Sequence, residues 1–431
     1  MINFVSMKVD LWLASRLKLR SGGSRSSATT GAVIAVAGVA LALVVMELTL
    51  AVVCGFKHDI TAKLRGFEAD ISVLPAYDYD TATSAPYITA SPQLRSLIGA
   101  KAALAMRLPG MLKTDSDFAV VEYRAWDSNH DFSFEQANVI SGRWPQYADS
   151  PGAADSLIVV SALTASRLAL APGSKVYSCY FVDGSIKTRR HTVAAIYESH
   201  FGDYDKSVAY ASLPALQRIA GIAPDGGSRL EIRGLALDSI APAADRLQQR
   251  LIDAYQAGAI AELHPTDNLT REGAIYLNWL ALLDTNVLVI FVLMICVAAF
   301  TLVSSLFILV LERVSTIGLL RALGASRRVV RNIFIYMALR LAGLGIIIGN
   351  IVGIGLALLQ LHTHALPLDP EMYYLSHVPI LIEPYMFIAL NVGVALVCWA
   401  VLVLPASFAA RGISATRQAP SSRLYSLCRC R

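Results

Sequence analysis

The sequence predicts a membrane protein with four transmembrane α-helices and a large α+β extracytoplasmic domain inserted between helices 1 and 2. Three observations predict this fold class. First, 55% of the 431 residues are hydrophobic and only 16% are charged, which is typical of membrane proteins. Second, four apolar runs are long enough to cross a bilayer, which takes about 20 helical residues. Third, the segment between the first two runs alternates short apolar stretches with turn residues, as folded aqueous domains do.

The apolar runs define the predicted transmembrane helices. The first run follows basic residues that look like the start of a signal peptide, but it is too long for a cleaved one, so we expect an anchor. The second run is longer than a bilayer needs, because about 38 residues span roughly 57 Å against about 30 Å of hydrocarbon. We therefore expect its first part to form an external stalk. The predicted segments are 31–54, 274–311 (stalk and helix 2), 333–361 and 386–408.

The distribution of arginines predicts the orientation. Five arginines follow the second span and five lie in the C-terminal tail, whereas the loop between the last two spans has no Lys or Arg. By the positive-inside rule both termini and the middle loop are cytoplasmic. The remaining predicted segments are a cytoplasmic interfacial helix at 1–30, an extracytoplasmic domain at 55–273, a cytoplasmic loop at 312–332, a short extracytoplasmic loop at 362–385 and a cytoplasmic tail at 409–431.

The predicted extracytoplasmic domain mixes strand and helix patterns. Period-two alternation and β-branched residues indicate strands, and three- to four-residue spacing indicates helices. Because the two patterns alternate irregularly, we expect an α+β domain. The strand-like stretches are 157–160, 176–182 and 191–196, and the helical ones are 163–170, 213–220 and 243–257.

Catalytic, cofactor-binding and metal-binding patterns are absent from the sequence. There is no G-x-x-x-x-G-K-[ST] phosphate loop, no H-E-x-x-H zinc motif and no G-x-S-x-G elbow. We therefore expect no enzymatic activity, no cofactor and no metal in this chain, and an energy source in a partner. The net charge of +5 is modest, and the basic residues lie near apolar segments, which disfavours nucleic acid as a partner.

One basic stretch is similar to a known family. Residues 313–328 read RVSTIGLLRALGASRR and resemble the signature cytoplasmic loop of the MacB and FtsX permease superfamily. The segment 320–323 can form a short amphipathic helix, Gly324 can break it, and Ser326 can cap the next helix. The resemblance implies contact with a cytoplasmic ATPase. The residues assigned to this coupling are Glu312, Arg313, Gly318, Leu320, Arg321, Ala322, Leu323, Gly324, Ala325 and Ser326.

Other parts of the chain resemble lipoprotein-releasing permeases of the LolC and LolE type. The matching stretches are GFKHDITAKLRGFEADISV from Gly55, SGRWP from Ser141, LAPGSKV from Leu170, IYE from Ile196, DYDK from Asp203 and LPLDPEMYYLSHVPI from Leu366. This resemblance covers nearly the whole chain. It implies a MacB-like periplasmic core domain at 55–273, an FtsX-like permease domain at about 285–415 and a multi-pass location in the bacterial inner membrane.

The resemblance also implies a function and partners. The implied function is release of lipoproteins from the inner membrane, driven by ATP that a partner hydrolyses. The implied partners are cytoplasmic ABC ATPase subunits, a second permease copy or paralogue, membrane lipid, and lipoproteins with a periplasmic carrier. Two alternatives stay open: FtsX-like transmission of motion to a cell-wall hydrolase, and MacB-like efflux.

Two ionisable residues and three glycines stand out within the predicted spans. Glu47 and Arg340 each cost about 2.5 to 3.5 kcal/mol inside a span, so both should face protein or a cavity. They could pair as a polar latch, or Arg340 could extend toward the cytoplasm while Glu47 lies near the outer headgroups. A four-residue repeat of glycines permits close helix approach, either as static packing or as a seam that rearranges. These glycines are Gly345, Gly349 and Gly353.

Overall fold

The structure is a computed structural model that describes residues 27–412, apart from 79–82, 100, 150, 183, 313–317, 320–321 and 325. The chain divides into two compact units. A helical unit holds residues 1–56, 282–365 and 379–431, and a head unit holds 57–281 and 366–378. Most of the predicted interfacial helix at 1–30 and of the tail at 409–431 lies outside the described residues.

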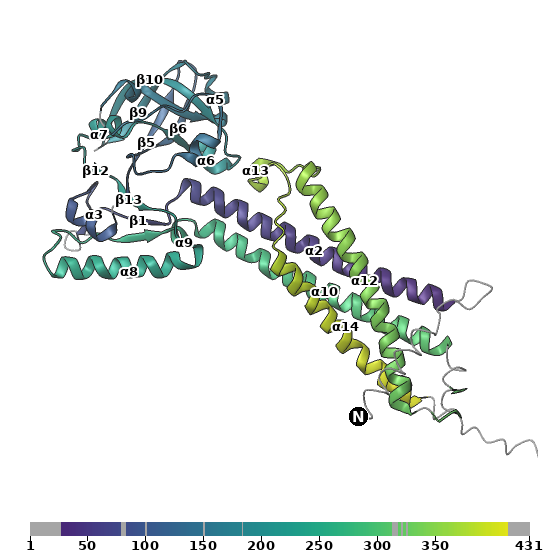
Figure 1. The fold of residues 1–431 in the computed structure, drawn as a ribbon. Coiled ribbons are helices and arrows are strands. Elements are labelled where there is room, and N and C mark those ends of the chain that lie inside the picture. Colours follow the sequence, from purple (N-terminus) through teal and green to yellow (C-terminus); the bar gives the residue numbers. More distant parts are fainter. Residues whose placement is uncertain are drawn as a thin grey trace, which may run out of the picture. The chain divides into compact units, whose positions relative to one another are not determined.

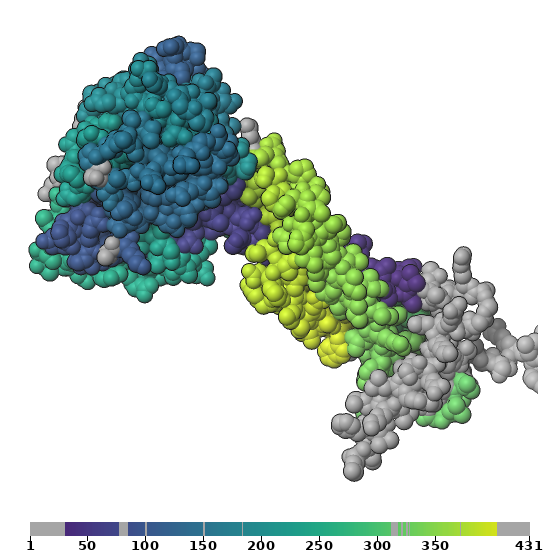
Figure 2. All heavy atoms as spheres, turned by 45° about the horizontal axis from the view of Figure 1, so that its top comes forward, coloured from purple at the N-terminus to yellow at the C-terminus, as the bar shows by residue number. Residues whose placement is uncertain are grey.

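Four long apolar helices, running side by side, build the helical unit (Figure 1). Each is long and apolar enough to cross a membrane. Many large apolar side chains point outward, such as Phe300 at 80% and Ile351 at 69% exposure. Figure 2 shows α12 and α14 adjacent along one face. So much exposed apolar surface suits lipid rather than water. The helices are α2 (Ser27–Phe67), α10 (Ala274–Glu312), α12 (Arg327–Thr363) and α14 (Pro384–Gly412).

A shared apolar core holds the four helices together. Each helix contributes buried side chains, and Leu43 and Met46 of α2 and Leu402 of α14 have no exposed surface. Close packing of this kind is the main attraction between helices in lipid, since burial from lipid gains little hydrophobic free energy. The other main core residues are Ala35, Leu302, Leu306, Phe334, Leu341 and Cys398.

The first helix continues beyond its predicted end at residue 54. It runs without interruption to Phe67, so its last residues belong to the head unit. Gly55 does not break it, because one glycine in a helix costs only about 1 kcal/mol. That glycine instead allows close approach, since a Cβ there would lie 2.7 Å from the carbonyl oxygen of Pro379. The boundary between the units falls after Phe56.

Six strands of the head unit close into a barrel. β5 (Ala103–Lys113) pairs with β6 (Phe118–Trp126) and with β9 (Lys175–Val182). Three further strands complete the ring between β6 and β9: β11 pairs with β6, β8 pairs with β11, and β10 pairs with both β8 and β9. Closure leaves no unpaired strand edge around this ring. The three further strands are β11 (Val208–Tyr210), β8 (Leu157–Ser161) and β10 (Ser185–Tyr197).

The sheet extends beyond the barrel from β5. In this direction it continues through β13 (Arg229–Ile232), β1 (Ile71–Val73) and β14 (Thr266–Asn268). Helix α8 (Leu237–Gln256) packs beside β14, and α3 (Pro92–Ile98) contacts α8 (Figure 1). The remaining described elements are β2 (Tyr77–Asp78), β3 (Thr83–Ser84), β4 (Ile88–Thr89), α4 (Ser133–Ala137), β7 (Val139–Gly142), η1 (Ala153–Ser156), α5 (Ala162–Leu168), α6 (Gly202–Ser207), α7 (Leu213–Ala220), β12 (Gly226–Gly227), α9 (Leu269–Glu272) and α13 (Pro370–Tyr373).

The strands and helices predicted in the head unit agree closely with the observed elements. Strands β8 and β9 and helix α7 match their predicted ranges within one residue, and 191–196 lies inside the longer β10. Helix α8 starts at Leu237, six residues before its predicted start. The prediction began after Pro242, which is the sixth residue of α8; there proline removes one backbone hydrogen bond, and the helix continues through it.

Part of the predicted loop at 362–385 packs within the head unit. Residues 366–378 belong to the head unit, where Tyr374 anchors them. The Nζ of Lys63 donates to the carbonyl oxygen of Tyr374 at 2.9 Å, and the Tyr374 hydroxyl donates to Asp203 at 3.2 Å. The Tyr374 ring also stands edge-on to Phe201, with 5.0 Å between centroids. The two segments are far apart in the sequence, and a contact between them produces no periodic pattern of residues. The contact was therefore not predicted from the sequence.

Candidate functional site

The predicted ATPase-coupling segment lies between α10 and α12. Its described part forms a helical turn in which the Leu323 amide donates to the Leu319 carbonyl at 3.0 Å. Gly324 ends the turn with a φ of +92°, a conformation that favours glycine. The Ser326 hydroxyl then accepts from the Val329 amide at 3.4 Å and caps α12. The cap and the glycine break were both predicted from the sequence.

The turn formed by the described residues 318–319 and 322–324, named the coupling turn after its predicted role, presents apolar side chains at its surface. Leu319 is 63% exposed and Leu323 is 77% exposed, one helical turn apart. Gly318 and Ala322 lie in the same turn, and Glu312 is the last residue of α10. Adjacent exposed leucines favour contact with another apolar surface. Arg313, Leu320, Arg321 and Ala325 lie outside the described residues.

Glu47 is enclosed within the helical unit and has polar neighbours on two other helices. Its side chain has no exposed surface, and Asn391 of α14 donates to its Oε1 at 3.4 Å. Asn391 also exchanges two hydrogen bonds with Asn350 of α12, at 2.7 and 3.0 Å. These three residues form a polar cluster that joins α2, α12 and α14. Buried polar groups of this kind need such partners, because unpaired ones are costly.

The predicted pair between Glu47 and Arg340 does not form. Arg340 is exposed on α12 and lies ten residues before Asn350, about 15 Å along the helix axis. Its guanidinium therefore cannot reach the carboxyl group. The enclosure of Glu47 by helices agrees with the expectation that an ionisable residue in a span faces protein.

The three repeated glycines of α12 face α2. A Cβ at Gly345 would lie 3.0 Å from the Val36 carbonyl oxygen, and one at Gly349 would lie 3.0 Å from the Leu43 side chain. A Cβ at Gly353 would collide with Oε2 of Glu47. The missing side chains thus make room for the backbone of α2 and for the Glu47 carboxyl group.

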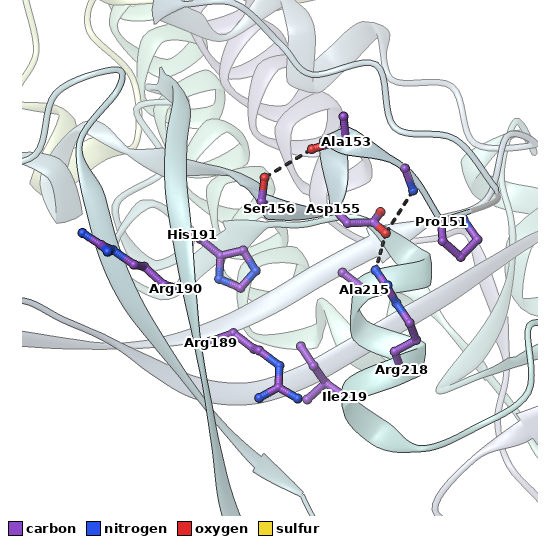
Figure 3. A pocket seen from close by; sticks show the side chains of 11 residues that line it. Pro151, Ala153, Asp155, Ser156, Arg189, Arg190, His191, Ala215, Arg218 and Ile219 are labelled. Atoms are coloured by element: carbon purple, nitrogen blue, oxygen red, sulfur yellow. Dashed lines mark hydrogen bonds and ion pairs between the residues drawn. The ribbon is translucent and has the colours of Figure 1, made fainter.

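The head unit carries an open, basic pocket of about 630 Å³ (Figure 3). Arg189 and Arg190 come from β10, and Arg218 comes from α7. Asp155 pairs with Arg218 and accepts from the Gly152 amide at 3.2 Å, whereas both β10 arginines are exposed. The pocket therefore carries excess positive charge and suits an anionic group.

His191 also lines this pocket, and we expect it to make the stability of the head unit sensitive to acid. It is only 4% exposed, and burial, with the charge of Arg189, lowers its pKa from 6.5 to about 4. The unfolded chain binds a proton first as pH falls, so stability is complete above about pH 6.5 and declines toward pH 4. When the pH is lowered from about 7.5 to about 5, we expect His191 to lower the free energy of unfolding by about 2 kcal/mol.

The variant His191→Gln tests this expectation. Thermal unfolding of the purified protein, followed by tryptophan fluorescence at both pH values, should show a smaller acid destabilisation in the variant. An equal loss of stability in variant and wild type would mean that other groups cause the acid sensitivity.

Among the described residues, no group of three or more His, Cys, Asp or Glu side chains is placed to hold a metal ion.

Comparison with known proteins finds one matching family and two similar relatives. Residues 288–412, which include α12, α14 and most of α10, match the family described as FtsX-like permease C-terminal. The lipoprotein-releasing system transmembrane protein LolC of Xylella fastidiosa strain Temecula1 is 25% identical over 366 residues, covering 79% of this chain and 82% of that protein. The LolC of strain 9a5c is 24% identical over 365 residues, with the same coverage. Residues 288–412 thus match an FtsX-like permease domain, and most of the chain is similar to LolC-type ABC transporter permeases.

The chain is a multi-pass protein of the inner membrane, and membership of the ABC permease family would imply an ATPase partner. The matched C-terminal segment includes the coupling turn between α10 and α12. A solved structure, the extracellular domain of the noncanonic ABC-type transporter YknZ from Gram-positive bacteria, is also similar. It aligns with 46% of the permease and 99% of its own length, at 13% identity and a TM-score of 0.31.

Sequence reasoning missed the partners of Glu47. Asn350 and Asn391 each lie inside a predicted span, where an amide side chain is a polar residue among apolar ones. That signal was available, because polar residues in spans usually bond across helices. The sequence does not show that both amides meet at one carboxyl group, since the three residues come from three helices.

Proposed function

We propose that this permease couples ATP hydrolysis by a cytoplasmic ABC ATPase to the release of lipoproteins from the inner membrane. The observation that carries the proposal is the similarity to LolC, which extends over 79% of the chain and so includes both helical and head units. ATP is used by the ATPase partner. In the complex, this chain pairs with a second permease copy or a paralogue.

The coupling turn supports the part of this proposal that concerns the ATPase. Residues 312 to 326 carry the contact with the ATPase, and the exposed Leu319 and Leu323 form its apolar part. The turn is followed directly by the capped start of α12, so force on the turn acts on that helix. The turn lies in the cytoplasmic loop predicted by the arginine distribution.

The helical unit supports the part of the proposal that concerns the lipoprotein. Its outward apolar surface is suited to lipid, which is where the acyl chains of a lipoprotein reside. The head unit receives the protein part of the cargo for a periplasmic carrier. Its basic pocket offers a surface for acidic groups.

Purification of the complex from native membranes tests the proposal. Mass spectrometry should identify an ABC ATPase and a trapped lipidated protein bound to this chain. A cell-wall hydrolase in place of the lipoprotein would instead indicate FtsX-like mechanotransmission. A separate outer channel protein would indicate MacB-like efflux, and either result would contradict lipoprotein release.

A further inference from the structure

Two arginines hold the C-terminal end of α2 in the head unit. Nη1 of Arg124 donates to the Phe67 carbonyl oxygen at 2.7 Å. Nη1 of Arg233 donates to the carbonyl oxygens of Arg65 and Gly66 at 2.6 and 3.2 Å. These are the last carbonyls of a 41-residue helix, which lack partners within the helix and carry partial negative charge. The guanidinium groups therefore satisfy both the hydrogen bonds and the charge of this helix end.

Arg124 belongs to the barrel, and Arg233 directly follows β13, the strand that pairs with β5 of the barrel. Arg124 lies in β6, where it faces Arg107 of β5 directly across the strand pair. Like charges at such positions repel. Glu68, the residue after α2, lies between them and pairs with Arg107 at 2.7 Å and with Arg124 at 3.1 Å. Burial alone would raise the pKa of Glu68, but the two arginines hold it well below its usual range.

Arg233 is fixed to the same network through Glu231. That carboxylate is fully buried and pairs with Arg233 and with Arg107, each at 3.1 Å. It also accepts from Nε1 of Trp126 at 2.8 Å. Burial alone would raise the pKa of Glu231, but the neighbouring arginines lower it to about 2. The carboxylate is therefore ionised at neutral pH, and Arg233 has a fixed anchor on β13.

The start of α10 meets the same network. Glu272, two residues before α10, pairs with Arg229 of β13 at 2.6 Å. A Cβ at Gly273 would lie 2.6 Å from Leu64 of α2, so the two helix ends touch closely. Burial raises the pKa of Glu272, and the nearby Glu68 adds to this effect. The ends of the two helices that enter the head unit are thus held by one buried set of charges.

We propose that Arg124 and Arg233 are positioning residues that transmit movement of α2 to the barrel of the head unit. Three residues connect α2 to β1, a length that limits the separation of the helix and the sheet but not the angle between them. The guanidinium clamps at three successive carbonyls fix that angle. Without them, the end of α2 turns against the sheet and the barrel no longer follows it. The inference rests on the proposed ATP-driven cycle but not on the identity of the cargo.

Hydrogen exchange in the intact complex with its ATPase tests the clamp. Exchange in β5, β6 and β13 is compared with and without a non-hydrolysable ATP analogue, for wild type and Arg233→Gln. In wild type we expect a nucleotide-dependent change in these strands, and in Arg233→Gln we expect that change to disappear. Permease-stimulated ATP hydrolysis should stay within about twofold, since the coupling turn is untouched, while transport falls at least about tenfold.

Matched variants separate the clamp from a merely structural role. Arg167→Gln removes an exposed guanidinium that pairs with Asp117 at 3.1 Å, outside the basic pocket, and it should keep the nucleotide-dependent change. Arg233→Lys keeps one charged donor near the carbonyls and should restore part of it, which also covers the case that Arg233→Gln does not fold. The proposal is overturned if the folded Arg233→Gln complex keeps the wild-type change, or if Arg167→Gln loses it equally.

The same experiment separates this inference from the proposed cargo. A wild-type complex that shows the nucleotide-dependent change in the barrel, lost in Arg233→Gln, supports the clamp even when no lipoprotein is released. Such a result would contradict only the proposed release of lipoproteins.

Discussion

Replacing Leu323 with glutamate is expected to abolish permease-stimulated ATP hydrolysis. Leu323 is 77% exposed on the coupling turn, so the substitution does not disturb the fold of the free permease. In the complex it would bury a carboxylate against the ATPase without a counter-charge, which costs several kcal/mol. Because about 1.4 kcal/mol corresponds to a factor of ten in binding, we expect a loss of stimulation of more than about tenfold.

The measurement is the ATPase rate of the reconstituted complex with wild-type or variant permease. Leu237→Glu is a suitable control, because Leu237 is 38% exposed at the start of α8 in the head unit, where an acidic residue is tolerated. The control should stimulate hydrolysis as the wild type does, and both variants should insert into the membrane normally. Unchanged stimulation by Leu323→Glu would contradict the assignment of this turn to ATPase coupling.

Replacing Gly353 with leucine is expected to disrupt the helical unit. The new side chain would collide with the carboxyl group of Glu47 and separate α12 from α2. It would also displace Glu47 from Asn391, which leaves a buried polar group without its partner. Together, overpacking and the lost hydrogen bond should cost about 3 kcal/mol or more.

Gly355 offers a matched control on the same helix. A Cβ at Gly355 meets no atom within 4 Å, so Gly355→Leu should be tolerated. The yield of monodisperse protein in detergent and its unfolding temperature should fall sharply for Gly353→Leu only. Similar behaviour of the two variants would show that the contact between α12 and α2 does not hold the unit together.

The long helices and the cap of α12 could be predicted because each depends on local sequence. Apolar runs of spanning length locate the helices, and Ser326 after Gly324 marks a helix start. The end of α2 was missed for the same local reason. Past residue 54 the helix loses its apolar character, yet it continues because its last turns are held by contacts in the head unit.

The polar cluster and the arginine clamp could not be predicted, because both assemble residues from distant segments. Glu47 and Asn391 are 344 residues apart, and Arg233 and Arg65 are 168 residues apart. In the sequence, Arg124 and Arg233 resemble any other charged residues of an aqueous domain. Their role is visible only once the strand register places them beside the end of α2.

The most direct test of the account is ATP-dependent release of a lipoprotein by the complex purified from native membranes and reconstituted into proteoliposomes. Release of a lipidated protein into the aqueous phase should require ATP and should be lost with Leu323→Glu. Active ATP hydrolysis without any release of lipidated protein, from a complex that contains both permease and ATPase, would contradict lipoprotein release as the function.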